Sequence, residues 1–495
     1  MKKTLINIFL GLLLISIGSC SGDWLNLEPS DSIPADEALV NFAGLNVARI
    51  GLYDGLQGTS RYTSYYAARM IYYGDVRGDD MQACESGKRT SVLYEMKYTA
   101  DDAPNMWNVQ YNVIRRANRI IEAVENNIVK GDNQDEIKGI YAEALVVRAL
   151  VHFDLVRVYG QTYTADNGAS LGVPIELSPK KAGSIPARNT VKEVYDQVVK
   201  DLQKAINDGF LTKKITTGYI NHWVAKALLS RVYLYMGDND KALKEAEEVI
   251  EQSPYKLWTN EEYVSNVWSK DNPAHSKEII FEIINASTDD WTDREGIAYL
   301  YNEDGYADAI ATKSFCELLQ SDPNDARLTA MLASSDDDLK KTYGDDKVWV
   351  NKFPANNMGE MRLNNVPLIR LSEIYLIAAE TAFKLGKKVK ADKYTNAIAL
   401  RANPKQIPLV NVNLERIIIE KRKELVGEGH RFFDAMRNNE TIVRYESVEN
   451  RGYHYVLSEK ESMKFDRTYY RTILPIPKSE MDVNPTLKGQ QNPGY

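Results

Sequence analysis

Residues 420–437, EKRKELVGEGHRFFDAMR, bring together side chains that could do chemistry. They include Glu424, Glu428 and His430, which is one of only five histidines in the chain. A zinc peptidase places two histidines four residues apart with a glutamate beside the first. His430 has no such partner, because the other four histidines are scattered singly. A glycosidase needs two carboxylates across a cleft, and a sequence with 69 acidic residues neither establishes nor excludes such a pair. The spacing favours a structural role for His430.

The same stretch has the features of a helix followed by a turn. Glu420, Glu424 and Glu428 recur every four residues and alternate with basic residues at 421–423, a pattern that suits ion pairs along a helix. Gly427 and Gly429 then end the helix. The stretch therefore indicates architecture before it indicates catalysis.

Apolar residues recur with helical spacing over most of the chain. In 191–206 the apolar positions form a stripe with a period of 3.6 residues, preceded by the candidate N-cap Thr190 and followed by Asp208-Gly209. The same pattern predicts further helices at 105–127, 135–159, 219–236, 240–252, 366–385, 388–401 and 413–426.

Several of these helices form pairs with the spacing of a 34-residue tetratricopeptide repeat. If Pro254 closes one repeat, then Leu229, Tyr233 and Ala242 occupy its leucine, aromatic and small positions. A weaker copy lies at 371–404, and a third combines 135–159 with 190–208 around an insertion. We therefore predict a mainly α fold, a tetratricopeptide-repeat-like scaffold of helical pairs with long irregular loops.

The expected loops are long and rich in aromatic residues. They cover about 58–104, 160–188 and 255–365. Loops of this length on a helical scaffold are usually functional or disordered. Their tyrosines and tryptophans argue against disorder, so we expect ligand-binding loops.

The N-terminus has the pattern of an export signal. Two lysines precede an apolar run at 5–15, which is too short to span a membrane, and small residues lead to Cys20. This resembles a bacterial lipobox, in which Cys20 is lipidated; the alternative is an ordinary cleaved signal with a chance cysteine. We expect a signal peptide at 1–19, a lipidated tether at 20–34 and one domain at 35–495.

Composition restricts the partners and cofactors. The formal net charge is −8 and basic residues do not cluster, so nucleic acid is a poor candidate partner. Cys84 and Cys316 could pair or remain free thiols, and neither has the spacing of a metal ligand. We expect no cofactor; a structural calcium ion bridging Asp101 and Asp102 stays open.

Three C-terminal segments carry a family resemblance. ELVGEGHRFFDAMR resembles the "ELxxEGxRxxDxxR" signature of the SusD/RagB family. Residues 369–381, IRLSEIYLIAAET, resemble its "RxxEvyLxxAEA" helix, and the tail ILPIPKSEMDVNPTLKGQQNPGY resembles its closing "PIPxxExxxNPxLxQNPGY". Residues 106–121 and 142–160 also look like its early helices, so the likeness runs from Cys20 to Tyr495.

The resemblance implies a function without catalysis. Members are outer-membrane lipoproteins of nutrient-uptake systems, which capture a glycan, or in some members a peptide. They act as a hinged lid over a SusC-like TonB-dependent transporter. The resemblance thus implies a glycan-binding protein at the cell surface, held in outer-membrane lipid through Cys20. Its repeat face would contact the transporter and its loops would hold the ligand.

Two of the expected loops, 58–104 and 255–365, offer aromatic faces and hydrogen-bonding groups of the kind that bind sugars. In the family, ligand contacts come from loops in these two parts of the chain, and the candidates here are Arg61, Tyr65, Tyr66, Tyr73, Arg77, Trp291, Tyr299, Tyr301 and Asn302. The alternative is that these side chains pack the loops onto the helices. Adjacent Tyr65 and Tyr66 should not both face the same way.

Three other functions remain to be weighed. The same architecture could bind oligopeptides, or serve as a repeat scaffold for protein assembly without a small ligand. A hidden carboxylate pair would support a hydrolase. On the helix predicted at 366–385, Glu373 and Glu380 need partners if buried, and Arg370, Arg422 and Arg431 are the expected ones.

Overall fold

The structure is a computed structural model that describes residues 38–58, 64–102, 106–179, 183–265, 267–286, 296–334, 347–354 and 360–495. Cys20, Arg61 and Trp291 lie outside the described residues.

Helices make up most of the described chain. The longer ones are α3 (Phe42–Gln57), α6 (Trp107–Glu125), α7 (Gln134–Tyr159), α9 (Val191–Asn207), α10 (His222–Met236), α11 (Asn239–Gln252), α18 (Leu371–Lys384), α19 (Lys388–Ala402) and α20 (Leu414–Leu425). Shorter helices are α4 (Arg69–Asp75), α5 (Ser91–Glu95), α8 (Tyr163–Asp166), α12 (Asn260–Val264), α13 (His275–Glu278), α14 (Ile297–Tyr301), α15 (Lys313–Gln320), α16 (Arg327–Met331), α21 (Arg431–Asn438), α22 (Lys478–Val483) and α23 (Pro485–Lys488). Short 3-10 helices are η2 (Met361–Leu363), η3 (Val448–Asn450), η4 (Lys460–Ser462) and η5 (Tyr470–Thr472).

The strands are short and pair two by two. They are β1 (Met81–Ala83), β2 (Ile279–Ile283), β3 (Ala309–Ala311), β4 (Leu332–Ser334), β5 (Val348–Val350), β6 (Val366–Arg370), β7 (Ile442–Val443) and β8 (Lys464–Phe465). The antiparallel pairs are β1 with β3, β2 with β6, β4 with β5, and β7 with β8.

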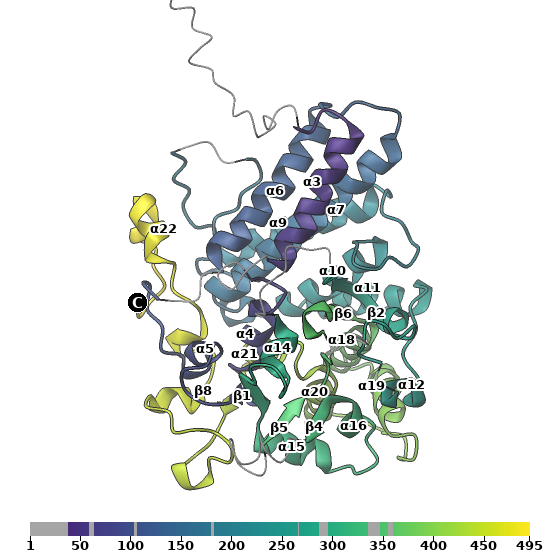
Figure 1. Cartoon of the computed structure of the whole chain (residues 1–495), viewed down its shortest axis with the longest axis vertical. Coiled ribbons are helices and arrows are strands. Elements are labelled where there is room, and N and C mark those ends of the chain that lie inside the picture. Colours follow the sequence, from purple (N-terminus) through teal and green to yellow (C-terminus); the bar gives the residue numbers. More distant parts are fainter. Residues whose placement is uncertain are drawn as a thin grey trace, which may run out of the picture.

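The long helices pack in antiparallel pairs, as the repeat spacing predicts. Helix α7 packs on α6 and α9, α10 on α11, and α18 on α19, while α11 joins the last two pairs. Figure 1 shows the earlier helices in the upper part and the later pairs below them. Residues far apart in sequence therefore meet where the irregular segments lie against the helices.

Local signals explain several helix ends. The Thr190 side chain accepts a hydrogen bond from the Glu193 backbone N–H at 3.2 Å, and the Glu193 carboxylate accepts one from the Thr190 N–H at 2.8 Å. This capping box starts α9 where the sequence predicts it. The Asn221 side chain likewise accepts hydrogen bonds from the first turn of α10.

Two expectations about elements are wrong. Residues 366–370 form β6 rather than the start of α18, because all five are buried against β2 and continuous burial has no distinguishing period. The segments 58–104 and 255–365, expected to be irregular, contain α4, α5 and α12–α16 together with β1–β5. These elements are too short to give a clear periodic signal.

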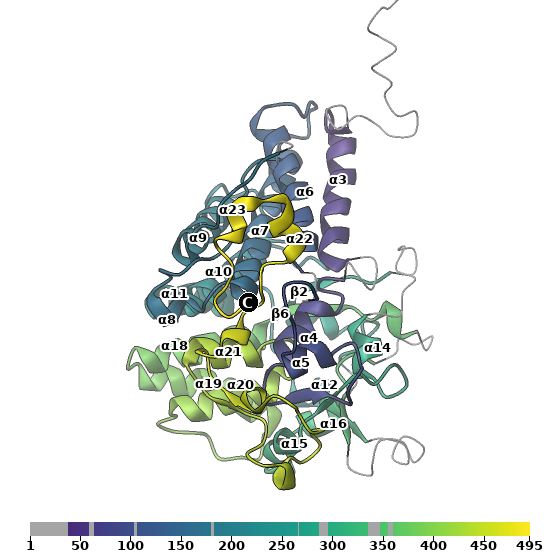
Figure 2. The same cartoon turned by 90° about the vertical axis from the view of Figure 1, so that its left-hand side faces the viewer.

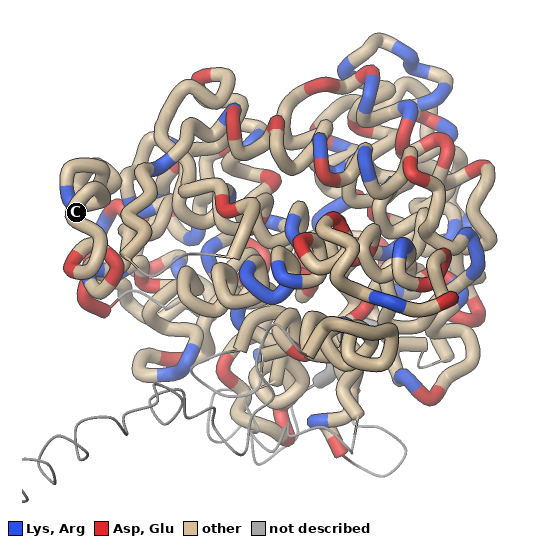
Figure 3. The backbone as a smooth tube through the Cα atoms, turned by 90° about the horizontal axis from the view of Figure 1, so that it is seen from above, with Lys and Arg blue, Asp and Glu red and all other residues tan. Residues whose placement is uncertain are grey.

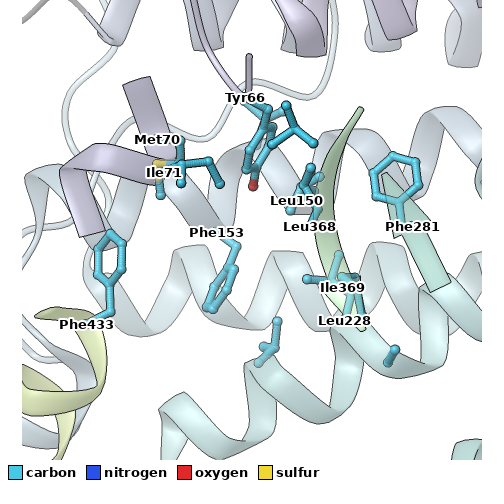
Figure 4. Close-up of a cluster of buried hydrophobic side chains, with 14 of the residues drawn as sticks. Tyr66, Met70, Ile71, Leu150, Phe153, Leu228, Phe281, Leu368, Ile369 and Phe433 are labelled. Atoms are coloured by element: carbon cyan, nitrogen blue, oxygen red, sulfur yellow. The ribbon is translucent and has the colours of Figure 1, made fainter. Parts of the chain in front are cut away.

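A continuous core joins the helical pairs to these short elements. Figure 4 shows Tyr66, Met70 and Ile71 facing Leu150 and Phe153 of α7, with Leu228, Phe281, Leu368, Ile369 and Phe433 around them. Aromatic side chains from the predicted loops therefore fill the space between the helices and the small sheets.

Buried acids on α18 have arginine partners, but not the expected ones. Glu373 receives two hydrogen bonds of 2.6 Å from Arg231, and Glu380 receives two, of 2.5 and 2.6 Å, from Arg437. Arg370, Arg422 and Arg431 bond instead to Glu428, Asp80 and Asp79, respectively. The need for a partner is confirmed; the identity of the partner depends on the fold.

Two further observations concern cysteines and membrane spans. Cys84 and Cys316 are buried and free, so the second of the two alternatives holds. None of the helices within the described residues is long and apolar enough to cross a bilayer.

Replacing Glu380 with alanine should lower the free energy of unfolding by about 3–5 kcal/mol, because the buried Arg437 loses its two bonds to Glu380 and keeps Asp434 as a carboxylate partner. We expect no selective change in ligand affinity. Urea unfolding followed by circular dichroism measures the effect.

The matched control is Asp196→Ala, which breaks the exposed Lys192–Asp196 pair of 2.6 Å and should change stability by less than about 1 kcal/mol. Equal stability of Glu380→Ala and the native protein would contradict the structural role.

Candidate functional site

A surface hollow of about 370 Å³ lies where α3, the turn before α10 and the end of β2 meet. Its lining consists of Ile50, Tyr53, Asp54, Gln57, Thr217, Gly218, Tyr219, Ile283, Ile284 and Ala286. Residues 50, 53, 54 and 57 share one face of α3, as their spacing requires. Three separate parts of the chain thus build one concave surface.

The hollow adjoins the two segments in which the ligand loops were predicted. Helix α3 ends at Gly58, just before residues 59–63, and the β2 side of the hollow ends at Ala286, just before residues 287–295. Figure 2 draws α3 and α14 along the same edge of the molecule, opposite α8.

Tyr219 is the exposed aromatic face of the hollow. It is 39% exposed, the guanidinium carbon of Arg49 lies 4.2 Å from its ring centroid, and the ring of Tyr53 meets it edge-on at 5.0 Å. An aromatic ring held in this way can stack on an apolar ligand face without first losing conformational freedom.

A buried carboxylate on α7 fixes these supports. Glu143 receives hydrogen bonds of 2.6 Å from both Arg49 Nε and Arg49 Nη2, and one of 2.9 Å from the Tyr53 hydroxyl. The Tyr53 hydroxyl in turn accepts a bond of 2.9 Å from the Ile220 N–H, next to Tyr219. Burial raises the pKa of Glu143, and the bonds from Arg49 and Tyr53 act in the opposite direction.

A glycine is required opposite β2. Gly218 has φ +73°, in the left-handed region, and a Cβ there would lie 2.2 Å from Cγ1 of Ile284. The Thr216 hydroxyl donates to the Tyr219 carbonyl at 2.6 Å and closes the turn. The turn can therefore approach β2 closely and present Tyr219 at the rim.

Amide side chains connect the hollow to the small β2–β6 sheet. Gln57 Nε2 donates to Asn285 Oδ1 at 2.6 Å and to the Ile284 carbonyl at 3.2 Å. Asn285 donates from its side chain to the Asn364 carbonyl at 2.6 Å and from its backbone to Asn365 Oδ1 at 3.1 Å. The part of the hollow formed by Gln57 and the end of β2 is thus held in place by hydrogen bonds as well as by packing.

Two of the predicted ligand residues lie on a second, nearby surface. Tyr299 and Asn302 are partly exposed, and the Tyr299 ring lies 5.8 Å from that of Tyr306. The guanidinium of Arg89 lies 3.8 Å above the Tyr306 ring. Tyr299 and Asn302 can therefore reach a ligand, and their role stays a prediction, as do those of Arg61 and Trp291.

Five predicted residues contact protein in this structure and offer no surface to a ligand. Tyr65, Tyr66, Tyr73, Arg77 and Tyr301 are all at most 4% exposed. Their burial matches the packing alternative.

Tyr65 and Tyr66 do face the same way, contrary to expectation. Their rings stack at 4.4 Å, and both hydroxyls donate to the same oxygen of Asp154. The residues lie in a turn before α4 and not in a strand, so the alternation of neighbouring side chains does not apply.

Of the other three buried residues, two join a predicted loop to the C-terminal segments, and Tyr301 joins two predicted loops to each other. Tyr73 stacks on Phe433 at 5.5 Å, and Arg77 donates to the Arg471 carbonyl at 2.6 Å. The Tyr301 hydroxyl donates to Asp75 Oδ2 at 2.8 Å. These contacts stabilise the fold.

Sequence reasoning missed Tyr53 and Tyr219. A helix predicted from residue 219 placed Tyr219 inside regular structure, whereas α10 begins at His222. Asn221 is a strong N-cap residue and could have shown that Tyr219 belongs to the preceding turn. The role of Tyr53 had no comparable signal.

His430 and the predicted calcium ligands show no catalytic or metal geometry. Burial lowers the pKa of His430 to about 4, so its imidazole is neutral at physiological pH. In the described part of the chain, no group of three His, Cys, Asp or Glu side chains could hold a metal ion. Asp101 and Asp102 are exposed, and calcium there stays a prediction.

Replacing Asp75 with asparagine should remove a pH dependence of stability. Burial raises the pKa of Asp75 to about 7, although bonds from Tyr301 and Gly429 act to lower it. Since the folded protein holds this proton more tightly than the unfolded chain, the stabilisation is complete below about pH 4 and is lost as the pH rises through 7. Asp75→Asn should therefore be more stable than the native protein at about pH 8.5, by at most about 4 kcal/mol.

Urea unfolding between about pH 4 and pH 8.5 tests this. The two proteins should have equal stability near the acidic end, and the exposed Asp196→Asn variant should follow the native protein throughout. Parallel pH profiles for Asp75→Asn and the native protein would contradict the assignment.

Comparison with known proteins gives a consistent family. A family model described as "SusD family" matches residues 216–495, and one described as "Starch-binding associating with outer membrane" matches residues 23–234. SusD-like protein P2 from Formosa agariphila is 26% identical, with 100% of both chains covered.

Solved structures share the fold. A proposed sugar-binding protein from Bacteroides vulgatus has a TM-score of 0.83 and 40% identity, covering 92% of this chain and 99% of its own. A laminarin-binding SusD-like protein has a TM-score of 0.71 and 25% identity, covering 92% of this chain and 100% of its own.

Proposed function

This chain belongs to the SusD family, and on that basis we propose that it captures oligosaccharides at the cell surface for a SusC-like TonB-dependent transporter. It acts as the lid of that transporter and binds its cargo without cleaving it.

The hollow beside Tyr219 is the observation that carries the ligand assignment. Sugars present apolar C–H faces with hydroxyls at the edges, and the hollow combines an exposed aromatic ring, aliphatic walls and the amide of Gln57. The names of two similar proteins, one laminarin-binding and one a proposed sugar-binding protein, support a carbohydrate ligand.

The N-terminus supports an anchored protein. The lipobox-like sequence ending at Cys20 would place acyl chains at the start of the mature chain, and several acyl chains hold a protein durably at a membrane. The family model that matches the N-terminal half carries the words "associating with outer membrane". Outer-membrane attachment through Cys20 agrees with both.

Removal of the Tyr219 ring should weaken oligosaccharide binding about tenfold, because loss of one aromatic contact worth about 1.4 kcal/mol changes Kd by that factor. The purified chain from Ser21 onward is screened on a glycan array and a mixed peptide pool. Hits are then titrated with Tyr219→Ala, with Tyr219→Phe, which keeps the ring, and with Trp291→Ala.

The control is Tyr163→Ala, which removes a partly exposed ring from α8 on the opposite edge and should bind normally. Glycan binding that is insensitive to Tyr219→Ala would place the site elsewhere, with the Tyr299–Tyr306 surface next in order. Binding of peptides alone would change the cargo to oligopeptides.

Replacing Cys20 with serine should release the protein from membranes or stall its processing, because the thiol that carries the acyl chain is absent. Fractionation of cells and metabolic labelling with a fatty acid measure both effects. A Ser19→Ala variant keeps a small residue before the cysteine and should stay lipidated. Unchanged labelling of Cys20→Ser would refute the lipobox.

A further inference from the structure

Among the described residues that line the hollow, the one charged side chain is paired within the protein. Asp54 lies 2.9 Å from Arg116 Nη1. The same guanidinium group donates to the Gly51 carbonyl and, from Nε, to Asn112 Oδ1 at 3.1 Å. Arg116 is therefore occupied by three acceptors from α3 and α6.

The second arginine at this surface is also occupied. Arg49 lies behind the Tyr219 ring and forms its two bonds of 2.6 Å with the buried Glu143. Although the Arg49 side chain is 24% exposed, its charge is balanced by Glu143, which lies midway along α7. Arg49 thus supports the aromatic ring as one partner of an ion pair.

The lysines near the hollow do not line it. Lys270 Nζ donates to the Asn285 carbonyl at 3.0 Å, below the end of β2. Lys213 and Lys214 lie in the exposed segment leading to Thr217 and are not among the lining residues. Over the described part of the chain, basic and acidic residues are interspersed (Figure 3).

From this arrangement we infer that the hollow selects uncharged saccharide units and excludes uronates and sulfated sugars. The inference rests on the proposed function and specifies its substrate class. A carboxylate or sulfate entering the hollow would lose part of its hydration, meet the Asp54 carboxylate and find no unpaired cation among the lining residues that the structure describes. A neutral unit would instead place C–H groups on Tyr219, Ile50 and Ile284 and its hydroxyls near Thr217 and Gln57.

The test compares one backbone in two charge states. Neutral β-glucan oligosaccharides and the same mixture oxidised at C6 to uronates are titrated into the chain from Ser21 onward by isothermal titration calorimetry. Neutral α-glucan and mannan oligosaccharides, each with its oxidised form, serve as further pairs. In every pair that binds, the neutral form should bind at least tenfold more tightly.

The outcomes separate the inference from the proposed function. Equal or tighter binding of the oxidised form would overturn the inference and leave oligosaccharide capture standing. Binding of neither form in any pair, together with an empty glycan array, would overturn both.

A charge variant tests the cause. Asp54→Asn leaves Arg116 without its carboxylate, so binding of the oxidised oligosaccharide should strengthen at least fivefold relative to the neutral one. Asp196→Asn removes a carboxylate of α9 that pairs with Lys192 away from the hollow, and its neutral-to-oxidised ratio should equal that of the native protein. A ratio that is unchanged in Asp54→Asn would overturn the role of the Asp54–Arg116 pair in selection.

Discussion

A buried group of charges around Arg370 determines how the parts of this fold are joined. Arg370 is 1% exposed and bonds to Glu428 at 2.7 Å, to Glu278 at 2.7 Å and to Glu424 at 3.0 Å. Although burial alone would raise the pKa of Glu424, Arg401 and Arg370 hold it below its usual value. Each ion has lost its hydration, so each depends on the others, and removing one would leave an unpaired charge in the interior. The arrangement fixes β6, α13, α19 and α20 relative to one another.

The small β2–β6 sheet connects the buried charges around Arg370 to the hollow. Arg370 ends β6, and β6 pairs with β2 so that Val366 lies opposite Ile283, one of the lining residues. Asn365, just before β6, accepts a bond from Asn285, and Asn285 accepts one from Gln57. The position of the hollow therefore follows from the position of a charge group that does not line it.

The glycine-rich turn after α20 also contacts the N-terminal part of the chain, at α4. A Cβ on Gly74 would lie 2.0 Å from the Gly429 carbonyl oxygen, so α4 contacts this turn backbone to backbone. Asp75 accepts a bond from the Gly429 N–H at 2.9 Å and another from Tyr301. The stretch at 420–437 owes its unusual composition to such contacts. Its acids pair α20 with arginines of β6, α16 and α19, its arginines at 422 and 431 bond to Asp80 and Asp79, and its glycines allow the close approach of α4.

The sequence predicts the helical scaffold better than it predicts the residues of the candidate site, and the reason is physical. Helices such as α9 and α10 are set by spacing and caps within about twenty residues, and those signals are present in the chain itself. The partner of a buried charge is not local: Glu373 pairs with Arg231, 142 positions away, although Arg370 is its neighbour in sequence. The same limit applies to tyrosines, since a ring in a long segment can stack on a ligand or donate its hydroxyl to a buried acid.

These two possible roles of a tyrosine explain why the predicted ligand residues differ from the tyrosines that line the hollow. Tyr65, Tyr66 and Tyr301 each donate to a buried aspartate, so their hydroxyls help to satisfy acids in the interior. Tyr53 does the same for Glu143, but from the rim of the hollow, where its ring also supports Tyr219. The neutrality of the hollow arises in the same way, from the pairs Arg49–Glu143 and Asp54–Arg116, which are 94 and 62 positions apart. The charge selectivity that we infer for the hollow would therefore depend on long-range pairing, which only the folded chain reveals.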